Sequence, residues 1–332
     1  MIRTSPQGAF PPRLGGKVTV IAEGRVNPGE VSGDGRSVVF GEFKPGEGES
    51  VFRWRDGQVE KLNTDGYSSF QAHSNHDASV VTYHRYSIPD ATDKSGNWDI
   101  ARWEDGKSKL IASSELDEMY PDIDDSGQTI VHERIDGNQG AIVRWSNGRS
   151  QDITDGEFLD LYADVSGDGR RIAFRRKFDD VYLHDQNGVT KPLPTEGNKP
   201  AGVTLDRTGA RILYAAKDED GDQDLFLTDL RTSTTTPIAA LKGVDEYNGE
   251  ISGDGETIVY TGIDRRKGGG DMNVYIWRDG ESRQLTWDDG GLNTIPSVSE
   301  DGNAVSWLWI DSEDTNNRKV LLWRKDEGGN SL

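Results

Sequence analysis

Short alternating runs of apolar and polar residues recur along the whole chain, separated by turns rich in Gly and Asp. The phrase VSGDGRRIAF at Val165–Phe174 is typical of a strand end, a tight turn and the start of a second strand. Six further copies, some degenerate, occur at Val31–Phe40, His73–Tyr83, Ile123–His132, Leu205–Tyr214, Ile251–Tyr260 and Val298–Trp307. The chain therefore contains seven repeats, and the repeat determines how the rest is interpreted.

Each repeat predicts four strands. In the first full copy, a short strand runs into Val31, and the turn Ser32–Gly35 leads to a second strand over Ser37–Phe43. A third strand follows at Ser50–Trp54, and an Asp-Gly turn leads to a fourth at Gln58–Leu62. Asp-Gly between alternating apolar runs is a strong hairpin signal. We therefore expect each repeat to form a four-stranded antiparallel meander.

A second phrase, a Trp shortly before an Asn/Asp-Gly turn, recurs at the end of the third strand. Five of the nine Trp residues occupy this place: Trp54, Trp103, Trp145, Trp277 and Trp323. A structural repeat explains them as packing between neighbouring sheets, without a ligand.

The turn positions of the seven copies are Ser32, Ser74, Asp124, Ser166, Asp206, Ser252 and Ser299, spaced 40 to 50 residues apart. A period of this length with four strands is the signature of a propeller blade. We predict an all-β, seven-bladed β-propeller over residues 17–332, after an irregular leader at 1–16. The last repeat has a polar tail in place of a fourth strand, and the isolated strand Lys17–Ala22 can supply it and close the ring.

The phrase Ser-x-Asp-Gly-x-x-Ile-x-Phe, followed by an apolar strand and Trp-x-Asp-Gly, resembles the repeats of the TolB-like, WD-type propeller family. The resemblance extends from about Lys17 to Trp323. That family often has Pro after the Ser, where this chain has Gly33, Gly167 and Gly253. The resemblance implies a propeller that acts as a protein-interaction platform, as a domain beside a peptidase, or in some relatives as a sugar lyase.

Composition narrows the classes of function. The chain has 332 residues, no Cys and a formal net charge of −20, which excludes thiolate chemistry and argues against nucleic acid as a partner. A membrane-spanning helix needs about 18 consecutive apolar residues, and no apolar run in the sequence approaches this length. The lack of Cys fits an extracytoplasmic or secreted bacterial protein, as a domain or after signal removal; a cytoplasmic location is also compatible. We expect a monomer.

Acidic residues recur two positions before the turn. The residues at this place are Glu30, Ala72, Asp122, Asp164, Thr204, Glu250 and Ser297. They belong to the innermost strands, so Glu30, Asp122, Asp164 and Glu250 are candidates for binding a basic ligand or a metal in the central channel. Solvation by channel water is the alternative.

An Asp-rich segment lies between the second and third strands of the fifth repeat. Asp218, Asp220, Asp222 and Asp224 alternate there, with Gly221 allowing a bend. Hard oxygen ligands at this spacing suit Ca²⁺. The alternative is an acidic loop whose Asp side chains cap its own backbone.

No motif in the sequence requires an enzyme. His73, His76 and His84 cluster in the second repeat, but a strand length of roughly 20 Å would separate His84 from the other two. We therefore expect a non-catalytic binding or scaffold propeller, with a protein or carbohydrate ligand on the face that carries the second-to-third-strand loops. The alternative is a polysaccharide-active enzyme of the lyase type, with acidic or His residues at the channel mouth.

Overall fold

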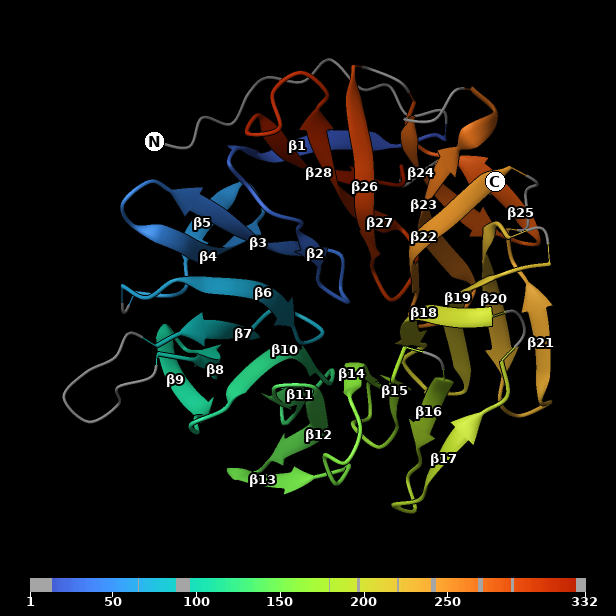
Figure 1. Cartoon of the computed structure of the whole chain (residues 1–332). Coiled ribbons are helices and arrows are strands. Elements are labelled where there is room, and N and C mark those ends of the chain that lie inside the picture. The colour runs from blue at the N-terminus through green and yellow to red at the C-terminus, as the bar shows by residue number, and fades with distance from the viewer. Residues whose placement is uncertain are drawn as a thin grey trace.

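Seven antiparallel sheets of four strands are arranged in a ring around a central axis (Figure 1), which confirms the predicted seven-bladed propeller. The computed structural model describes residues 14–64, 66–87, 96–178, 180–195, 198–219, 221–239, 243–267, 271–287 and 290–326. No helix in these ranges is long and apolar enough to cross a membrane.

Blades 1 to 3 follow the predicted meander. Blade 1 contains β2 (Glu30–Val31), β3 (Ser37–Lys44), β4 (Gly48–Arg55) and β5 (Gln58–Lys61). Blade 2 contains β6 (Ser69–Ser74), β7 (Val80–Tyr86), β8 (Trp98–Glu104) and β9 (Lys107–Ala112). Blade 3 contains β10 (Asp117–Ile123), β11 (Thr129–Asp136), β12 (Gln139–Ser146) and β13 (Arg149–Asp152).

Blades 4 to 6 repeat the same order from the channel outward. Blade 4 contains β14 (Asp160–Val165), β15 (Ile172–Arg176), β16 (Asp180–His184) and β17 (Thr190–Leu193). Blade 5 contains β18 (Asn198–Leu205), β19 (Arg211–Lys217), β20 (Gln223–Asp229) and β21 (Thr234–Pro237). Blade 6 contains β22 (Val244–Ile251), β23 (Thr257–Asp264), β24 (Met272–Arg278) and β25 (Glu281–Gln284), with the short 3-10 helix η1 (Arg265–Lys267) after β23.

Blade 7 joins the two ends of the chain. It contains β26 (Gly291–Val298), β27 (Ala304–Asp311) and β28 (Arg318–Arg324), and its outer strand is β1 (Lys17–Gly24). The antiparallel register runs from Lys17 opposite Arg324 to Gly24 opposite Arg318. The predicted ring closure is confirmed, and the strand extends two residues beyond Ala22.

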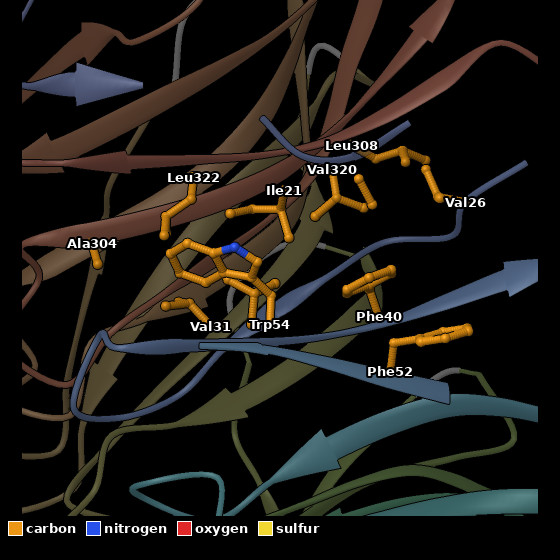
Figure 2. Close-up of a cluster of buried hydrophobic side chains, with 12 residues drawn as sticks. Ile21, Val26, Val31, Phe40, Phe52, Trp54, Ala304, Leu308, Val320 and Leu322 are labelled. Carbon is orange, nitrogen blue, oxygen red and sulfur yellow. The ribbon is translucent and has the colours of Figure 1, made fainter. Parts of the chain in front are cut away.

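The core lies between neighbouring blades rather than in one central mass. Figure 2 shows the junction of blades 7 and 1, where Ile21 of β1 lies beside Leu322 and Trp54 of blade 1. Trp54, Trp103 and Trp323 are buried, as expected for residues that pack between sheets. Because burial of one large apolar side chain contributes about 1.5–3 kcal/mol, each of these junctions stabilises the ring substantially.

The repeated Ser-Gly-Asp-Gly phrase forms the hairpin between the first two strands of a blade. The Ser32 hydroxyl donates to Asp34 Oδ1 at 2.6 Å and accepts from Ser37 N at 3.0 Å. Gly35 closes the turn in the left-handed region with φ 67°, which favours glycine. The phrase is thus explained by local turn chemistry and not by ligand binding.

Candidate binding site at the open end of the channel

The seven hairpin turns close one end of the channel. Their backbones form a continuous ring of seven hydrogen bonds, 2.8 to 3.3 Å long, each from one turn to another. The bonds are Asp34 N to His76 O, His76 N to Asp125 O, Asp125 N to Gly167 O, Gly167 N to Arg207 O, Arg207 N to Gly253 O, Asp254 N to Glu300 O and Glu300 N to Gly33 O. We call this ring of turns the closed end.

Four charged side chains from these turns contact one another across the closed end. His76 Nδ1 lies 2.5 Å from Glu300 Oε1, and Arg207 Nη1 donates to Glu300 Oε2 at 2.6 Å. The Arg207 Nε lies 2.5 Å from Asp125 Oδ2. Hydrogen bonding to Glu300 raises the pKa of His76 and favours its charged form.

Glycines at the closed end make room for these side chains. A Cβ at Gly33 would lie closer than 3 Å to His76 and Glu300, and one at Gly167 closer than 3 Å to Asp125 and Arg207. A Cβ at Gly253 would meet Glu300 in the same way. This crowding gives a physical reason for Gly where TolB-like repeats often have Pro.

Above the turns, one residue from each innermost strand faces the channel. The alignment of the second repeat must be shifted by one residue, because Asn75 and not Ser74 acts as the turn residue. Asn75 N donates to Val80 O, and Asn75 Oδ1 accepts from Val80 N at 2.9 Å, as Ser32 does with Ser37. Seven equivalent residues, which we call the lumen ring, are therefore Glu30, His73, Asp122, Asp164, Thr204, Glu250 and Ser297.

The four predicted carboxylates connect blades. Glu30 Oε1 accepts from Ser74 N at 3.0 Å, and Asp122 Oδ2 accepts from Val165 N at 2.7 Å. Asp164 accepts in the same way from Leu205 N of blade 5 at 2.9 Å. Glu250 accepts from Val298 N of blade 7 at 3.4 Å. The structure thus brings all four into one ring, where each already has a structural partner.

His73 is the cation of the lumen ring, and the misaligned repeat concealed it. Its Nδ1 lies 2.6 Å from Glu30 Oε2 and 3.7 Å from Asp122 Oδ1. Burial opposes a charged ring, but Glu30, Asp122 and Glu250 outweigh it and raise the pKa of His73 to about 10. The side chain keeps 40% of its accessible surface because it borders the lumen.

Glu250, Asp122 and Asp164 ionise less readily than usual. Burial and the charge of Glu30 raise the pKa of Glu250 to about 7. Burial raises the pKa of Asp122 to about 6 although His73 acts against it, and burial with Asp122 raises that of Asp164 well above its ordinary value. Near neutral pH the lumen ring therefore combines the positively charged His73 with carboxyl groups of which some are only partly ionised.

A cavity of about 560 Å³ opens above the lumen ring, on the side away from the turns. Its floor includes Glu30, His73 and Glu250, and its walls come from blades 1, 2, 3 and 7. The remaining lining residues are Asn27, Pro28, Gly29, Gly41, Glu49, Val51, Phe70, Gln71, Ala72, His84, Met119, Tyr120, Ile295, Pro296 and Ser297. We call this side of the channel the open end.

The sequence of blade 1 explains where the cavity lies. In the other blades, the residue two before the lumen ring adopts a left-handed conformation within a bulged inner strand; examples are Tyr120 and Ile295, with φ of 50° and 48°. Blade 1 has Pro28 at this place, and proline cannot adopt positive φ. Its inner strand β2 has only two residues, so Gly41 and Val51 of the next strands border the cavity.

A second layer of polar side chains supports the bulges. His84 Nδ1 accepts from Tyr120 N at 3.4 Å, Thr261 Oγ1 accepts from Ile295 N at 3.2 Å, and Glu133 Oε1 accepts from Tyr162 N. Burial lowers the pKa of His84 to about 4 and raises that of Glu133 to about 8, so both are neutral near pH 7.

Two histidines that we expected to be far apart line the same cavity. The bulge in β6 and its register with β7 place His84 opposite Phe70, only three residues from His73. At about 3.3 Å per residue, this is roughly half of the separation expected from the sequence. His76 lies instead at the closed end.

Two of the predicted calcium ligands, Asp218 and Asp222, lie in the loop between β19 and β20, and Asp224 lies in β20 itself. Asp218 Oδ1 accepts from Asp222 N at 3.1 Å, and Asp222 Oδ2 accepts from Gly243 N at 2.8 Å. Asp224 is buried, and burial raises its pKa to about 6. Asp220 lies outside the described residues. Within the described ranges, no three His, Asp or Glu side chains gather in an arrangement that could hold a metal ion.

The chain is similar in fold to several solved structures. One is oligogalacturonate lyase from Vibrio parahaemolyticus, with a TM-score of 0.71 and 13% identity over 96% of this chain and 97% of that chain. An oligogalacturonate lyase in complex with manganese has a TM-score of 0.69 and 14% identity over 98% and 99%. TolB from Acinetobacter baumannii has a TM-score of 0.53 and 14% identity over 89% and 68%.

No protein-family model matches the chain, and no curated protein matches it in sequence. At these low identities, the similarity to solved structures establishes the propeller fold and does not by itself assign an activity.

Proposed function

We propose that this chain is a non-catalytic binding propeller of the TolB-like kind and that its ligand enters the cavity at the open end. The observation that carries the proposal is the cavity itself. Its volume of about 560 Å³ lies in the range of known ligand sites, and its lining combines apolar side chains with a few polar groups. The closed end leaves the opposite side as the way in.

Lining side chains of the cavity contact one another, which favours binding without a large ordering cost. Glu49 Oε1 accepts from Asn27 Nδ2 at 2.6 Å. Phe70 stacks on the His84 ring with 5.8 Å between centroids. A preorganised site of this kind loses little side-chain freedom when a ligand enters.

A lyase acting on acidic oligosaccharides is the second candidate, favoured by the fold shared with two oligogalacturonate lyases. The charge of the cavity argues against it. Three carboxylates, those of Glu30, Glu49 and Glu250, line the cavity, and among the described residues that line it there is no Lys or Arg. A polyanionic sugar would bring further negative charge against them, which costs free energy at close range.

A crystallographic fragment screen tests the proposal. We expect bound fragments to concentrate in the cavity of the wild type and to be absent from it in Gln71→Trp. Gln71 is an exposed lining residue at the bulge position where other blades carry Tyr120 and Tyr162, so the fold accepts a large side chain there.

The matched control is Asn248→Trp, at the same bulge position of blade 6 but outside the cavity lining, and it should leave the fragments in place. Fragments scattered without preference for the cavity would refute the proposal. Incubation with oligogalacturonate, with and without manganese, gives the second measurement. Growth of the unsaturated product's absorbance would establish the lyase instead.

A further inference from the structure

We propose that the cavity at the open end binds an organic cation, an ammonium or guanidinium group carried on an apolar stem. This inference rests on the proposed function and specifies the chemistry of its ligand. Basic side chains of a partner protein have this chemistry, as do free alkylamines.

The balance of charge in the cavity is the first argument. Glu30, Glu49 and Glu250 line it, and Asp122 and Asp164 lie in the lumen ring. The cation among these lining residues is His73, and Glu30 already pairs with it. A bound cation would therefore meet carboxylates whose charge the protein itself compensates only in part.

Glu49 illustrates this incomplete compensation. Its Oε1 accepts from the neutral amide of Asn27 at 2.6 Å, and Asn27 Oδ1 in turn accepts from Arg318 Nη1 at 3.1 Å. The amide thus separates Glu49 from the guanidinium. Burial raises the pKa of the Glu49 carboxyl, with the Asn27 hydrogen bond and Arg318 acting against it.

Glu250 is the carboxylate best placed to gain from a cation. Its hydrogen-bond partners are the Ser297 hydroxyl and Val298 N, and the latter is 3.4 Å from Oε2, which is a long hydrogen bond. The charged groups that face it are Glu30 of β2, His73 of β6 and Asp164 of β14. Because burial and Glu30 raise the pKa of Glu250 to about 7, a bound cation would favour its ionised form.

The apolar wall supplies a place for the stem. Phe70, Met119, Tyr120, Ile295 and Pro296 line the cavity between its floor and its mouth. Aromatic faces next to carboxylates also attract a cation through their quadrupole.

One polar atom of a largely buried side chain in the wall is left for the ligand. His84 is 4% exposed and accepts from Tyr120 N at its Nδ1, so the neutral ring carries its hydrogen on Nε2. Among the described residues, His84 Nε2 has no hydrogen-bond partner in the structure. A carbonyl or hydroxyl oxygen on the ligand stem, such as that of a peptide, could accept from it.

Three compounds with one stem test the inference: 4-phenylbutylamine, 4-phenylbutanol and 4-phenylbutyrate, titrated calorimetrically into the wild type. We expect the amine to bind at least about ten-fold more tightly than the alcohol, and the carboxylate to bind most weakly. The affinity for the amine should rise from pH 6 to pH 8, because Glu250 ionises over this range while the amine stays charged.

Glu250→Gln keeps the size of the side chain and should lower amine affinity about ten-fold and remove its dependence on pH. The control is Glu281→Gln, an exposed carboxylate on the outer strand β25, which should change neither. Melting curves of both variants verify folding. If Glu250→Gln does not fold, the amine titration of Gln71→Trp replaces it, because loss of binding in that variant locates the amine in the cavity.

Two results would overturn the inference. Tighter binding of the carboxylate than of the amine, with fragments still found in the cavity, would refute the cationic ligand and leave the proposed function intact. Amine binding that Glu250→Gln leaves unchanged would place the amine elsewhere on the acidic surface. Absence of any fragment from the cavity would instead refute the proposed function, which separates the two failures.

Discussion

The two ends of the channel are built from the same seven repeats, yet one is closed and the other is hollow. At the closed end the seven turns differ in sequence, yet their backbones join in an unbroken hydrogen-bonded ring. At the open end the inner strands differ, since blade 1 has Pro28 and a two-residue strand where other blades have a bulge. The repeated backbone hydrogen bonds of the turns close one end of the channel, and the short inner strand of blade 1 leaves a cavity at the other end.

The ends also differ in how their charges are arranged. At the closed end His76, Glu300, Arg207 and Asp125 pair two cations with two anions. In the lumen ring, His73 faces several carboxylates, and the pKa values of Asp122 and Glu250 are raised. The balanced ion pairs at the closed end indicate a structural role. The excess of negative charge in the lumen ring favours binding of a positively charged ligand.

The largest effect should come from His73→Gln. Removing the cation leaves Glu30 and Asp122 in the lumen without it, and we expect a loss of about 2–3 kcal/mol in unfolding free energy at pH 7. The measurement is denaturant unfolding. His76→Gln at the closed end is the matched control and should cost at most about 1 kcal/mol, because its partner Glu300 keeps a second cation, Arg207, when His76 is removed. Equal losses of unfolding free energy in His73→Gln and His76→Gln would contradict the difference in charge balance between the lumen ring and the closed end.

Stability should fall as pH rises above neutral. The folded pKa of His73 is about 10 against an ordinary value of 6.5, so its stabilising contribution is complete below about pH 6.5 and is lost as pH rises through 10. Raised pKa values of Glu250, about 7, and Glu133, about 8, act in the same direction between their ordinary value of 4.5 and these limits.

We therefore expect unfolding free energy to drop by about 2 kcal/mol from pH 6 to pH 9 and to drop less in His73→Gln. Denaturant titrations at several pH values measure this difference. A stability that increases over this range would contradict the charge states assigned to the lumen ring.

A smaller effect should follow Gly167→Ala at the closed end. The new methyl group would crowd Asp125 and Arg207, whose flexible ends can partly give way, so we expect a loss of about 1 kcal/mol. Gly15→Ala is the control, because nothing lies within 4 Å of a Cβ there. Thermal melts of both variants measure the difference, and equal melting temperatures would mean that the closed end is loosely packed.

The smallest effect concerns calcium at Asp218, Asp220, Asp222 and Asp224, which remains a proposal. If Ca²⁺ binds this loop, melting temperature should rise by a few degrees with calcium relative to chelator, and Asp220→Ala should abolish the rise. Asp218 and Asp222 already cap backbone N–H groups. If the melting temperature of the wild type does not change with calcium, hydrogen bonding to backbone N–H groups remains as the role of these Asp side chains.

Local sequence was sufficient to predict the architecture and part of the site. Turn chemistry and strand alternation specify a hairpin wherever they occur, so seven copies of one phrase predicted seven blades and the closing strand at Lys17–Ala22. The same periodicity placed Glu30, Asp122, Asp164 and Glu250 on the innermost strands. It failed in blade 2, where Asn75 replaces the turn Ser and the alignment moved by one residue. A check of which side chain could cap the turn at Val80 N would have identified His73.

The sequence by itself determined the propeller and the acidic character of its channel, because these follow from contacts close along the chain or repeated at a fixed period. It also determined the ring closure, because the unpaired strand at one end of the chain matches the strand that the last repeat lacks. Only the tertiary structure decided which end is closed, where the cavity lies and which groups meet in it. Those features depend on bulges, on Pro28 in one blade and on side chains of five blades that converge at the channel axis. Charges brought together in this way shift one another's pKa values, and no local pattern in the chain contains that information.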